Sequence, residues 1–425
     1  MHGAALTGDL THEARAEQAV RTDPVQVLCD RDVIHDVVMR YAKGVDSRDM
    51  EMVRSCFSPD CDATRWGPGP GDREAMIEYI SGVGHFHTTM HMMGNQFVEV
   101  DGDRAAVDSY AMLTHHRELG DGRVHKLDVN GSRYVEHLER RDGAWVVVQR
   151  GGEPSWAPNG VRGLDSADPA VRWLLDRAEI HDLLVQYALG VDMRDDERIR
   201  RCFAPGFHAA YGDREFVDLD ELCAFISGVE HFHSTTHFLG TQLVEVAAAL
   251  GTDEAWCTTY SLITHRPRED DPEAEWVAAG RYVDRLARVD GEWRIADRGA
   301  RAHAGRPARL AAPTAGDDAR VVALVDRAVV HDVIVRSAID SDDASGGTTH
   351  HFLNNQLVEI DGDRAHAETY LFAVEREAPG APPSPWSDGA RRWLDELVRG
   401  DGGWELAGRR EVTNRVPDEL VLHPE

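Results

Sequence analysis

The sequence predicts an α+β fold built from three tandem repeats, and two observations carry that prediction. First, one phrase recurs: it reads HFHTTMHMMGNQFVEVDGD at His85–Asp103, HFHSTTHFLGTQLVEV at His231–Val246 and THHFLNNQLVEIDGD at Thr349–Asp363. Second, the full copies place helical patterns before strand patterns, an order typical of α+β domains. A phrase that returns in successive units marks a tandem array. The 425 residues leave room for about three domains of ordinary size.

Repeat one is expected at residues 28–151 and opens with a helix. In DRDVIHDVVMRYAKGVDSRD the apolar residues recur at helical spacing, and Gly44 is expected to end the helix just before Asp46. Two further helices are expected at Met50–Phe57 and Arg73–Gly82. The histidine phrase and a turn at Asp101–Asp103 follow. Strands are then expected at Arg104–His116, Asp128–Arg140 and Ala144–Arg150, with a hairpin turn at Asp142–Gly143.

Repeat two, at residues 170–299, reproduces this order, whereas repeat three, at residues 319–416, is truncated. From the aspartate at the end of the first helix to the strand histidine, the interval is 45 residues in repeat one (91−46) and nine in repeat three (351−342). The room for the two short helices is therefore missing, and we expect repeat three to be structural. The remaining segments are a disordered leader (1–27), two linkers (152–169 and 300–318) and a tail (417–425).

Composition excludes several classes of partner. The net charge of −29 argues against nucleic acid and against anionic membrane surfaces, both of which attract clustered Lys and Arg. No stretch approaches the roughly 18 apolar residues that a membrane helix needs, and the first residues lack the basic and apolar segments of a secretion signal. The six cysteines are scattered, with Cys56 and Cys202 at matching places that suit small buried side chains. We therefore expect a cytoplasmic protein without disulfides.

A short set of polar residues recurs in apolar surroundings in the first two repeats. On the strand that carries His115, the alternate residues are mostly apolar, so the imidazole is expected to face the interior. A buried histidine beside a buried carboxylate is a general-base pair, because the carboxylate fixes the ring and raises its basicity. The candidate catalytic residues are Asp46, His91, His115 and Tyr41 in repeat one and Asp192, His237, His265 and Tyr187 in repeat two. Candidate substrate contacts are His87, His233, Tyr134 and Tyr282.

Repeat three serves as an internal comparison. It keeps the aspartate and the first histidine as Asp342 and His351, but Ser337 stands at the place of Tyr41. Glu375 stands at the place of the second histidine, and Gly347 at the place of His87. These losses coincide with the loss of the enclosing helices, which indicates that the missing residues belong to a pocket.

Each candidate also has a structural explanation when it is taken singly. A buried histidine is most often a core residue with satisfied hydrogen bonds, Asp46 could stabilise the turn after a helix, and Tyr41 could be a core residue. A second group of histidines lies beside the apolar stripe of each first helix. Its members, His35, His181 and His331, are present in all three copies and suit a structural role.

A metal site is the competing chemical hypothesis. The spacing of His85, His87 and His91 would put three imidazoles on one face of a continuous strand, where they could bind zinc or iron. Gly84 and the threonines interrupt such a strand, and no cysteine supports the site. We therefore expect neither a metal nor another cofactor.

Several of these phrases resemble the SnoaL-like polyketide cyclase and scytalone dehydratase-like family, within the nuclear transport factor 2-like superfamily. They are YAKGVDSRD and YALGVDMRD, HMMGNQ and HFLGTQ, and the histidine that closes SYAMLTH and TYSLITH. The resemblance covers the first two repeats nearly end to end and the third in part. It implies tandem cone-shaped α+β barrels, in which helices pack in a strongly curved antiparallel sheet around an apolar pocket.

The resemblance also implies roles for the candidate residues. In the scytalone dehydratase branch an aspartate after the first helix and two strand histidines serve dehydration. These roles fall on Asp46, His91 and His115 and on Asp192, His237 and His265. A likeness to bile-acid dehydratase adds Tyr41 and Tyr187, and lindane dehydrochlorinase shares the Gly-Val-Asp phrase and the strand histidine.

The expected function is that of a cofactor-independent lyase or isomerase of the dehydratase type, in secondary metabolism. Its substrate would be a small polyketide-like or polycyclic hydroxy-ketone. Two alternatives remain: a polyketide cyclase or epoxide-opening hydrolase in the same pocket, or a non-catalytic ligand-binding or scaffold protein. Because members of the family assemble as dimers or trimers, the three repeats could form an intramolecular pseudo-trimer, and association into a homo-oligomer is open.

Overall fold

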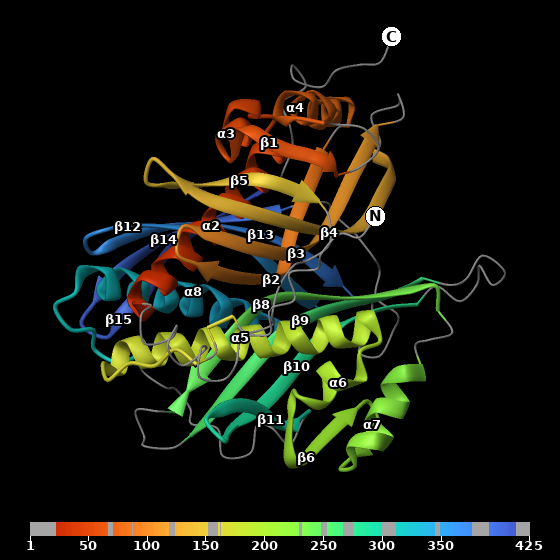
Figure 1. The fold of residues 1–425 in the computed structure, drawn as a ribbon, viewed down its shortest axis with the longest axis vertical. Coiled ribbons are helices and arrows are strands. Elements are labelled where there is room, and N and C mark those ends of the chain that lie inside the picture. The colour runs from red at the N-terminus through yellow and green to blue at the C-terminus, as the bar shows by residue number, and fades with distance from the viewer. Residues whose placement is uncertain are drawn as a thin grey trace, which may run out of the picture.

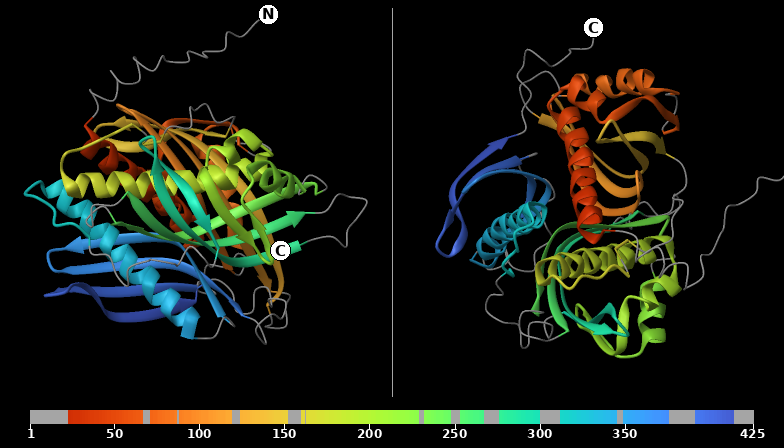
Figure 2. Two further views of the ribbon diagram at one scale, coloured as in Figure 1. Left: turned by 90° about the horizontal axis from the view of Figure 1, so that it is seen from below. Right: turned by 60° about the vertical axis from the view of Figure 1, so that its left-hand side comes forward.

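Three units, each with one long helix and one curved sheet, lie around a common centre in the computed structural model (Figures 1 and 2). The structure describes residues 23–66, 71–86, 88–118, 124–151, 160–161, 163–228, 232–247, 253–266, 276–299, 312–344, 349–375 and 391–413. In each unit the long first helix packs against the strand that carries the recurring histidine. This is the repeated α+β architecture that the sequence predicts.

Repeat one has a mixed five-stranded sheet of order β1-β5-β4-β3-β2. Its elements are α2 (Pro24–Asp46), α3 (Met50–Ser55), β1 (Phe57–Arg65), α4 (Arg73–Ser81), a 3-10 turn (Gly82–His85), β2 (Thr88–Asp101), β3 (Arg104–Glu118), β4 (Val124–Arg141) and β5 (Ala144–Gly151). Strand β1 is not predicted by the sequence, and the helix predicted to reach Phe57 stops at Ser55. Strand β1 pairs in parallel with β5, so its partner comes from the far end of the repeat.

The first helix differs from its prediction at both ends. It begins at Pro24, inside the stretch expected to be a disordered leader, because the carboxylate of Asp23 accepts a hydrogen bond from the amide of Val25 at 3.0 Å and caps it. Gly44 does not end it. The helix continues to Asp46, and a Cβ at position 44 would stand 2.9 Å from the side chain of Val53, so the glycine permits close packing of α3. The remaining leader residues, 1–22, lie outside the described residues.

Repeat two repeats this plan with one extra short strand. Its elements are α5 (Pro169–Met193), α6 (Asp196–Arg200), β6 (Phe203–Tyr211), β7 (Arg214–Phe216), α7 (Leu219–Ile226), β8 (Ser234–Val246), β9 (Glu254–Arg266), β10 (Trp276–Val289) and β11 (Glu292–Arg298). The sheet order is β7-β6-β11-β10-β9-β8, and β6 again pairs in parallel with the last strand. Equivalent residues therefore occupy equivalent places in the two repeats.

Repeat three is a reduced copy. Its elements are α8 (Ala319–Ala344), β12 (Thr349–Asp361), β13 (Arg364–Glu375), β14 (Arg391–Gly400) and β15 (Gly403–Thr413). The sheet order is β12-β13-β14-β15, and within the described residues it has no counterpart of α3, β1 or α4. As the short interval predicts, the long helix leads almost directly into the histidine strand.

The three repeats form a closed ring, the pseudo-trimer that the family resemblance suggests. An arginine from the start of each long helix pairs with an aspartate of the next long helix: Arg31 with Asp182 at 2.7 Å, Arg177 with Asp332 at 2.7 Å, and Arg327 with Asp36 at 2.9 Å. In each ion pair the arginine belongs to one repeat and the aspartate to the next, so the three pairs run in the same direction around the ring. Figure 2 shows the three long helices and their sheets arranged about this centre.

Two of the recurring histidines on the long helices also join repeats. His181 binds the side chain of Gln242 at 3.0 Å and the carbonyl of Gln96, in repeat one, at 2.8 Å. His331 binds Gln356 in its own repeat at 2.8 Å and the carbonyl of Gln242 at 3.1 Å. A structural role is confirmed for these two, while His35 is half-exposed beside Asp36.

An apolar core lies where the three repeats meet. It is formed by buried side chains from the three histidine strands, the strands beside them and helix α5: Met90, Met92, Phe97, Tyr110, Met112, Val185, Leu189, Phe238, Tyr260, Leu262, Phe352 and Tyr370. Strand β2 is buried along most of its length, because its own repeat covers one face and the neighbouring repeats cover the other. This double burial explains why the histidine phrase does not alternate apolar and polar residues.

Two composition-based expectations can be compared with the coordinates. All six cysteines are free thiols, and Cys56 and Cys202 are buried as expected. Among the described helices, none combines the length and the apolar character needed to cross a bilayer.

Candidate active site

The aspartate and the first histidine of repeat one form a buried pair between the end of α2 and strand β2. Asp46 Oδ1 lies 2.7 Å from His91 Nδ1, and Asp46 Oδ2 accepts the backbone amide of His91 at 2.8 Å. The hydroxyl of Thr89 donates to Asp46 at 3.0 Å. Because a carboxylate only accepts hydrogen bonds, the neutral imidazole carries its proton on Nδ1 and leaves Nε2 as the basic atom.

The second histidine faces this pair from the neighbouring strand. His115 lies opposite Thr89 in the register of β2 and β3, and its ring centroid is 6.0 Å from that of His91. It is half-buried, with the ring of Phe86 at 4.5 Å. On the other side, Tyr41 lies edge-on to His91 at 6.5 Å. The structure thus brings together Asp46 and three of the rings that the sequence identifies.

Beneath these rings lies an ion pair that the sequence analysis missed. The guanidinium of Arg150 and the carboxylate of Glu136 are both buried and 2.7 Å apart. Arg150 also stands over the rings of Tyr41, at 3.8 Å, and Tyr134, at 4.6 Å. Burial raises the pKa of Tyr41, and Arg150 opposes that effect without cancelling it. The phenol therefore stays protonated and can donate a hydrogen bond at neutral pH.

The cluster around Asp46 and His91 is called site one, and the equivalent cluster in repeat two, called site two, has the same hydrogen bonds between aspartate, histidine and threonine. Asp192 lies 2.7 Å from His237 Nδ1 and 2.8 Å from its backbone amide, and Thr235 donates to it at 3.1 Å. The ring of His265 lies 6.0 Å from that of His237. The distances within the two dyads agree to 0.1 Å, so the aspartate holds the first histidine in the same way in both sites.

The floor of site two carries an additional phenol. Arg298 forms a buried pair with Asp284 at 2.7 Å and stands over Tyr187 and Tyr282 at 4.2 and 4.3 Å. The hydroxyl of Tyr187 lies 2.8 Å from that of Tyr211. Site one has the exposed Arg65 at the place of Tyr211 in the repeat (211−146), so its floor lacks this second phenol. The two sites therefore present different surfaces to a ligand.

One predicted substrate contact, His233, does not join these clusters. His233 is exposed, because it lies just before β8 at the surface. His87 falls outside the described residues. Tyr134 and Tyr282, in contrast, are close to the first-helix tyrosines, with ring separations of 6.0 Å in each repeat.

The third repeat keeps the dyad but not the surroundings. His351 Nδ1 lies 2.6 Å from Asp342, and Asp342 also accepts the backbone amide of His351 at 3.1 Å. Trp393 stands at the place of Tyr134 and its ring lies 5.4 Å from His351, over the Asp395–Arg409 pair. The larger indole occupies the space beside the imidazole, and the enclosing helices are absent from the described residues. This dyad has neither the second histidine nor the tyrosine.

The buried arginines escaped the sequence analysis because charged residues near strand ends are usually solvated. Their only signal is recurrence: an acidic residue and an arginine recur fourteen positions apart in each repeat (150−136, 298−284 and 409−395). The competing metal hypothesis has no support in the described part of the chain, where no three His, Cys, Asp or Glu side chains converge. His85 instead stacks against Phe86 at 4.0 Å.

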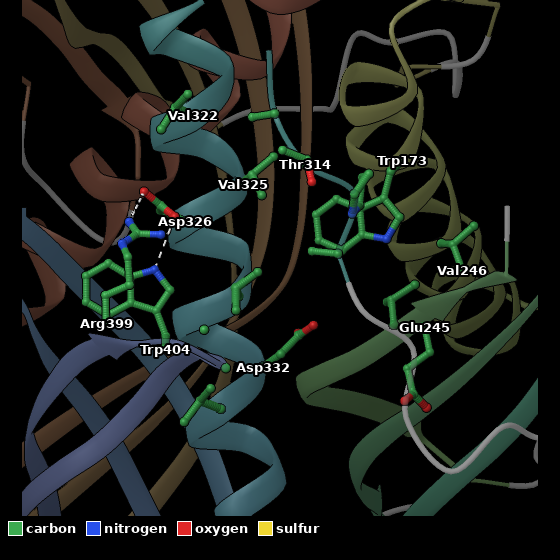
Figure 3. A pocket seen from close by; sticks show the side chains of 18 of the residues that line it. Trp173, Glu245, Val246, Thr314, Val322, Val325, Asp326, Asp332, Arg399 and Trp404 are labelled. Atoms are coloured by element: carbon green, nitrogen blue, oxygen red, sulfur yellow. Dashed lines mark hydrogen bonds and ion pairs between the residues drawn. The ribbon is translucent and has the colours of Figure 1, made fainter. Parts of the chain in front are cut away.

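A separate cavity of about 480 Å³ lies between repeats two and three (Figure 3). Its walls include Trp173, Trp404 and the linker segment 312–315. The acidic groups that face it are all paired: Asp326 with Arg399, Glu245 with Arg336, and Asp332 with Arg177. None of the catalytic candidates lines it, so this cavity is distinct from both dyads.

Comparison with known proteins gives a family match over all three repeats. The sequence model of the SnoaL-like domain matches residues 26–151, 172–299 and 317–410. No curated protein matches the chain.

Solved structures match the chain at low identity. A candidate scytalone dehydratase from Novosphingobium aromaticivorans is 21% identical over 29% of this chain and 82% of its own, with a TM-score of 0.27. A type 2 hexachlorocyclohexane dehydrochlorinase is 23% identical over 30% of this chain and 87% of its own, with a TM-score of 0.26. A candidate dehydratase of the nuclear transport factor 2-like family from Streptomyces avermitilis is 13% identical over 30% of this chain and 99% of its own, with a TM-score of 0.27.

Proposed function

The chain belongs to the SnoaL-like domain family, and on that premise we propose that it is a cofactor-independent lyase or isomerase of the dehydratase type. Its substrate would be a polycyclic or polyketide-like hydroxy-ketone, and repeats one and two would each hold one site. The observation that carries the proposal is the duplicated buried dyad, in which the carboxylate occupies Nδ1 and leaves Nε2 as the base.

The first step would be removal of a C–H proton next to the substrate carbonyl by Nε2 of His91 or His237. Asp46 and Asp192 hold the ring by its Nδ1 and by the backbone amide of the same residue, so the base is oriented before substrate arrives. The imidazolium that forms is stabilised by the adjacent carboxylate. A positioned base of this kind contributes about 10²–10⁴ in rate.

The second step would be departure of the hydroxyl group. The electron pair left on carbon forms the C=C bond, the C–O bond breaks, and the second histidine, His115 or His265, gives a proton so that water leaves. The two imidazole centroids are 6.0 Å apart, so base and acid would reach neighbouring atoms of one small substrate bound against both rings. Tyr41, held protonated over Arg150, would donate to the carbonyl oxygen as negative charge develops there.

The test uses a β-hydroxy-tetralone, whose dehydration and tautomerisation give a naphthol that is followed by absorbance and identified by mass spectrometry. The double variant His91→Gln with His237→Gln should lose turnover and keep the melting temperature within a few degrees. The matched control is His351→Gln, which removes the same contact from the repeat without a second histidine and should keep full turnover. Unchanged turnover in the double variant would overturn the proposal, and a rearranged product of unchanged mass would favour the cyclase alternative.

A further inference from the structure

The histidine strand of repeat one is held by a residue of repeat three. Asn355, on β12, accepts the backbone amide of Met93 through Oδ1 at 2.6 Å and donates through Nδ2 to the carbonyl of His91 at 2.6 Å. Asp46 already holds the amide and the ring of the same histidine. His91 is therefore fixed from two repeats at once: its ring and N–H from its own repeat, and its C=O from repeat three.

The same contact recurs at the next junction. Asn95 of repeat one accepts the amide of Leu239 at 2.6 Å and donates to the carbonyl of His237 at 2.8 Å. Asn95 has a φ of 45°, in the region that favours glycine, and it sits where the pairing of β2 with β3 shifts register. The backbone irregularity turns the side chain out of its own sheet toward the neighbouring repeat. A strained residue that makes two short hydrogen bonds has a positional role.

The third junction lacks this contact. Thr241 occupies the matching place in repeat two, and its buried hydroxyl has no hydrogen-bond partner in the part of the chain that the structure describes. A Cβ on the adjacent Gly240 would lie 3.0 Å from the carbonyl oxygen of Leu353, compared with 2.5 Å between a Cβ on Gly94 and the carbonyl oxygen of Leu239, so the two strands also come close at this junction. The strand without the amide contact is the one that bears His351. The contact is present for both proposed sites and absent for the dyad closed by Trp393.

A tyrosine of each repeat also lies beside the dyad aspartate of the next repeat. Tyr260 of repeat two donates to Asp342 of repeat three at 2.5 Å. At the equivalent places, Tyr110 is hydrogen-bonded to Asp192, and Tyr370 lies close enough to Asp46 for that carboxylate to raise its pKa further above the value set by burial. Each dyad aspartate thus faces a tyrosine from the preceding repeat.

We propose that each working dyad is positioned in trans by the preceding repeat, and that repeat three acts as the positioning subunit of site one. Asn355 is the positioning residue for His91, as Asn95 is for His237, and Tyr370 faces the carboxylate. The catalytic meaning of this inference rests on the proposed function, whereas the geometric part concerns the dyad alone. Hydrogen bonds hold His91 at its backbone N–H, its backbone carbonyl and its ring Nδ1, and together they fix the position of the imidazole. A displacement of about 1 Å in a reacting group can cost about 10²-fold in rate.

The test is made in full-length protein carrying His237→Gln, so that only site one works. Asn355→Thr introduces the residue that the chain itself has at the third junction. Thr241→Val is the matched control: it removes the hydroxyl at the junction that lacks the amide contact. The rate is measured with 5-nitrobenzisoxazole, in which loss of the ring C–H proton breaks the N–O bond and releases a coloured cyano-nitrophenolate. The second readout is the nitrogen-15 NMR signal of the His91 Nδ1–H, assigned by its loss in His91→Gln.

Asn355→Thr should lower kcat about tenfold or more with little change in KM, and should shift or broaden the His91 signal. In a wild-type background the His237 signal should stay in place, and Thr241→Val should change neither readout. Asn95→Thr in the His91→Gln background, where only site two works and the His237 signal is read, serves as the second variant if Asn355→Thr folds poorly. An unchanged His91 signal, or equal changes at both histidines, would overturn the inference. If wild-type protein shows no elimination, the proposed function fails while the NMR signals still decide the positioning.

Discussion

Replacing Asp46 with asparagine should silence site one while leaving the fold intact. The carboxylate accepts three hydrogen bonds, from the hydroxyl of Thr89 at 3.0 Å and from the backbone amide and Nδ1 of His91 at 2.8 and 2.7 Å. A carboxamide has one accepting oxygen, and its NH₂ group donates. If that group faces Nδ1, the imidazole proton moves to Nε2, the atom proposed to receive the substrate proton. The rate at site one should then fall about 10²–10⁴-fold.

The cost in stability can be separated from the cost in rate. Asparagine leaves at least one buried donor of this cluster without an acceptor, which costs about 1–3 kcal/mol. Asp342→Asn is the matched control, because Asp342 binds His351 through the same atoms at 2.6 and 3.1 Å. Both variants should lose similar stability in urea titrations, and only Asp46→Asn should lose 5-nitrobenzisoxazole turnover in the His237→Gln background. Equal losses of turnover in the two variants, or none in Asp46→Asn, would refute the reasoning.

Three further perturbations test the ring and the floor of the site. Gly94→Ala places a Cβ 2.5 Å from the carbonyl oxygen of Leu239, so denaturant titration should show a loss of about 1–3 kcal/mol, whereas Gly280→Ala, with open space around it, should show little change. Burial and neighbouring carboxylates raise the pKa of Glu99 from 4.5 to about 7, so the contribution of Glu99 to stability should be highest below pH 4.5 and should be lost as the pH rises through 7. That shift corresponds to about 3 kcal/mol before solvent screening and about 1–2 kcal/mol after it, and Glu99→Gln should flatten the slope in pH-dependent melting. Glu136→Gln leaves a buried guanidinium without its counter-ion and should cost about 3–5 kcal/mol in the same titrations.

The order of helices and strands could be predicted because it is written in local apolar spacing. Strands β1 and β6 could not, since each is stabilised by a parallel partner from the far end of its repeat, and that pairing leaves no local signature. The end of α2 is predicted wrongly for a related reason. A glycine at this position is typical of a helix stop, but Gly44 is required by the close approach of Val53 from α3, and that contact depends on the tertiary fold.

The dyads could be predicted because recurrence in one chain substitutes for comparison between chains. The residues that act between repeats could not be predicted in this way. Asn355 and Asn95 lie in a strand that continues on both sides of them, and only the register shift directs their amides into the next repeat. The buried Arg150 and Arg298 could not be predicted for the same reason, since the burial of each depends on a carboxylate from another strand.

The dyad in repeat three shows that an Asp–His pair does not by itself indicate a working site in this fold. In all three repeats the aspartate at the end of the long helix accepts the backbone amide of the strand histidine, so the pair ties helix to strand wherever it occurs. This contact between helix and strand stabilises repeat three as well, where Trp393 fills the space beside His351, and this explains why the pair is present there. What distinguishes repeats one and two is the second histidine, whose ring faces that of the first with 6.0 Å between the centroids. Because His115 is half-buried whereas Asp46 is fully buried and accepts three hydrogen bonds, removing His115 should cost less stability than removing Asp46, and either change should cost most of the activity of site one.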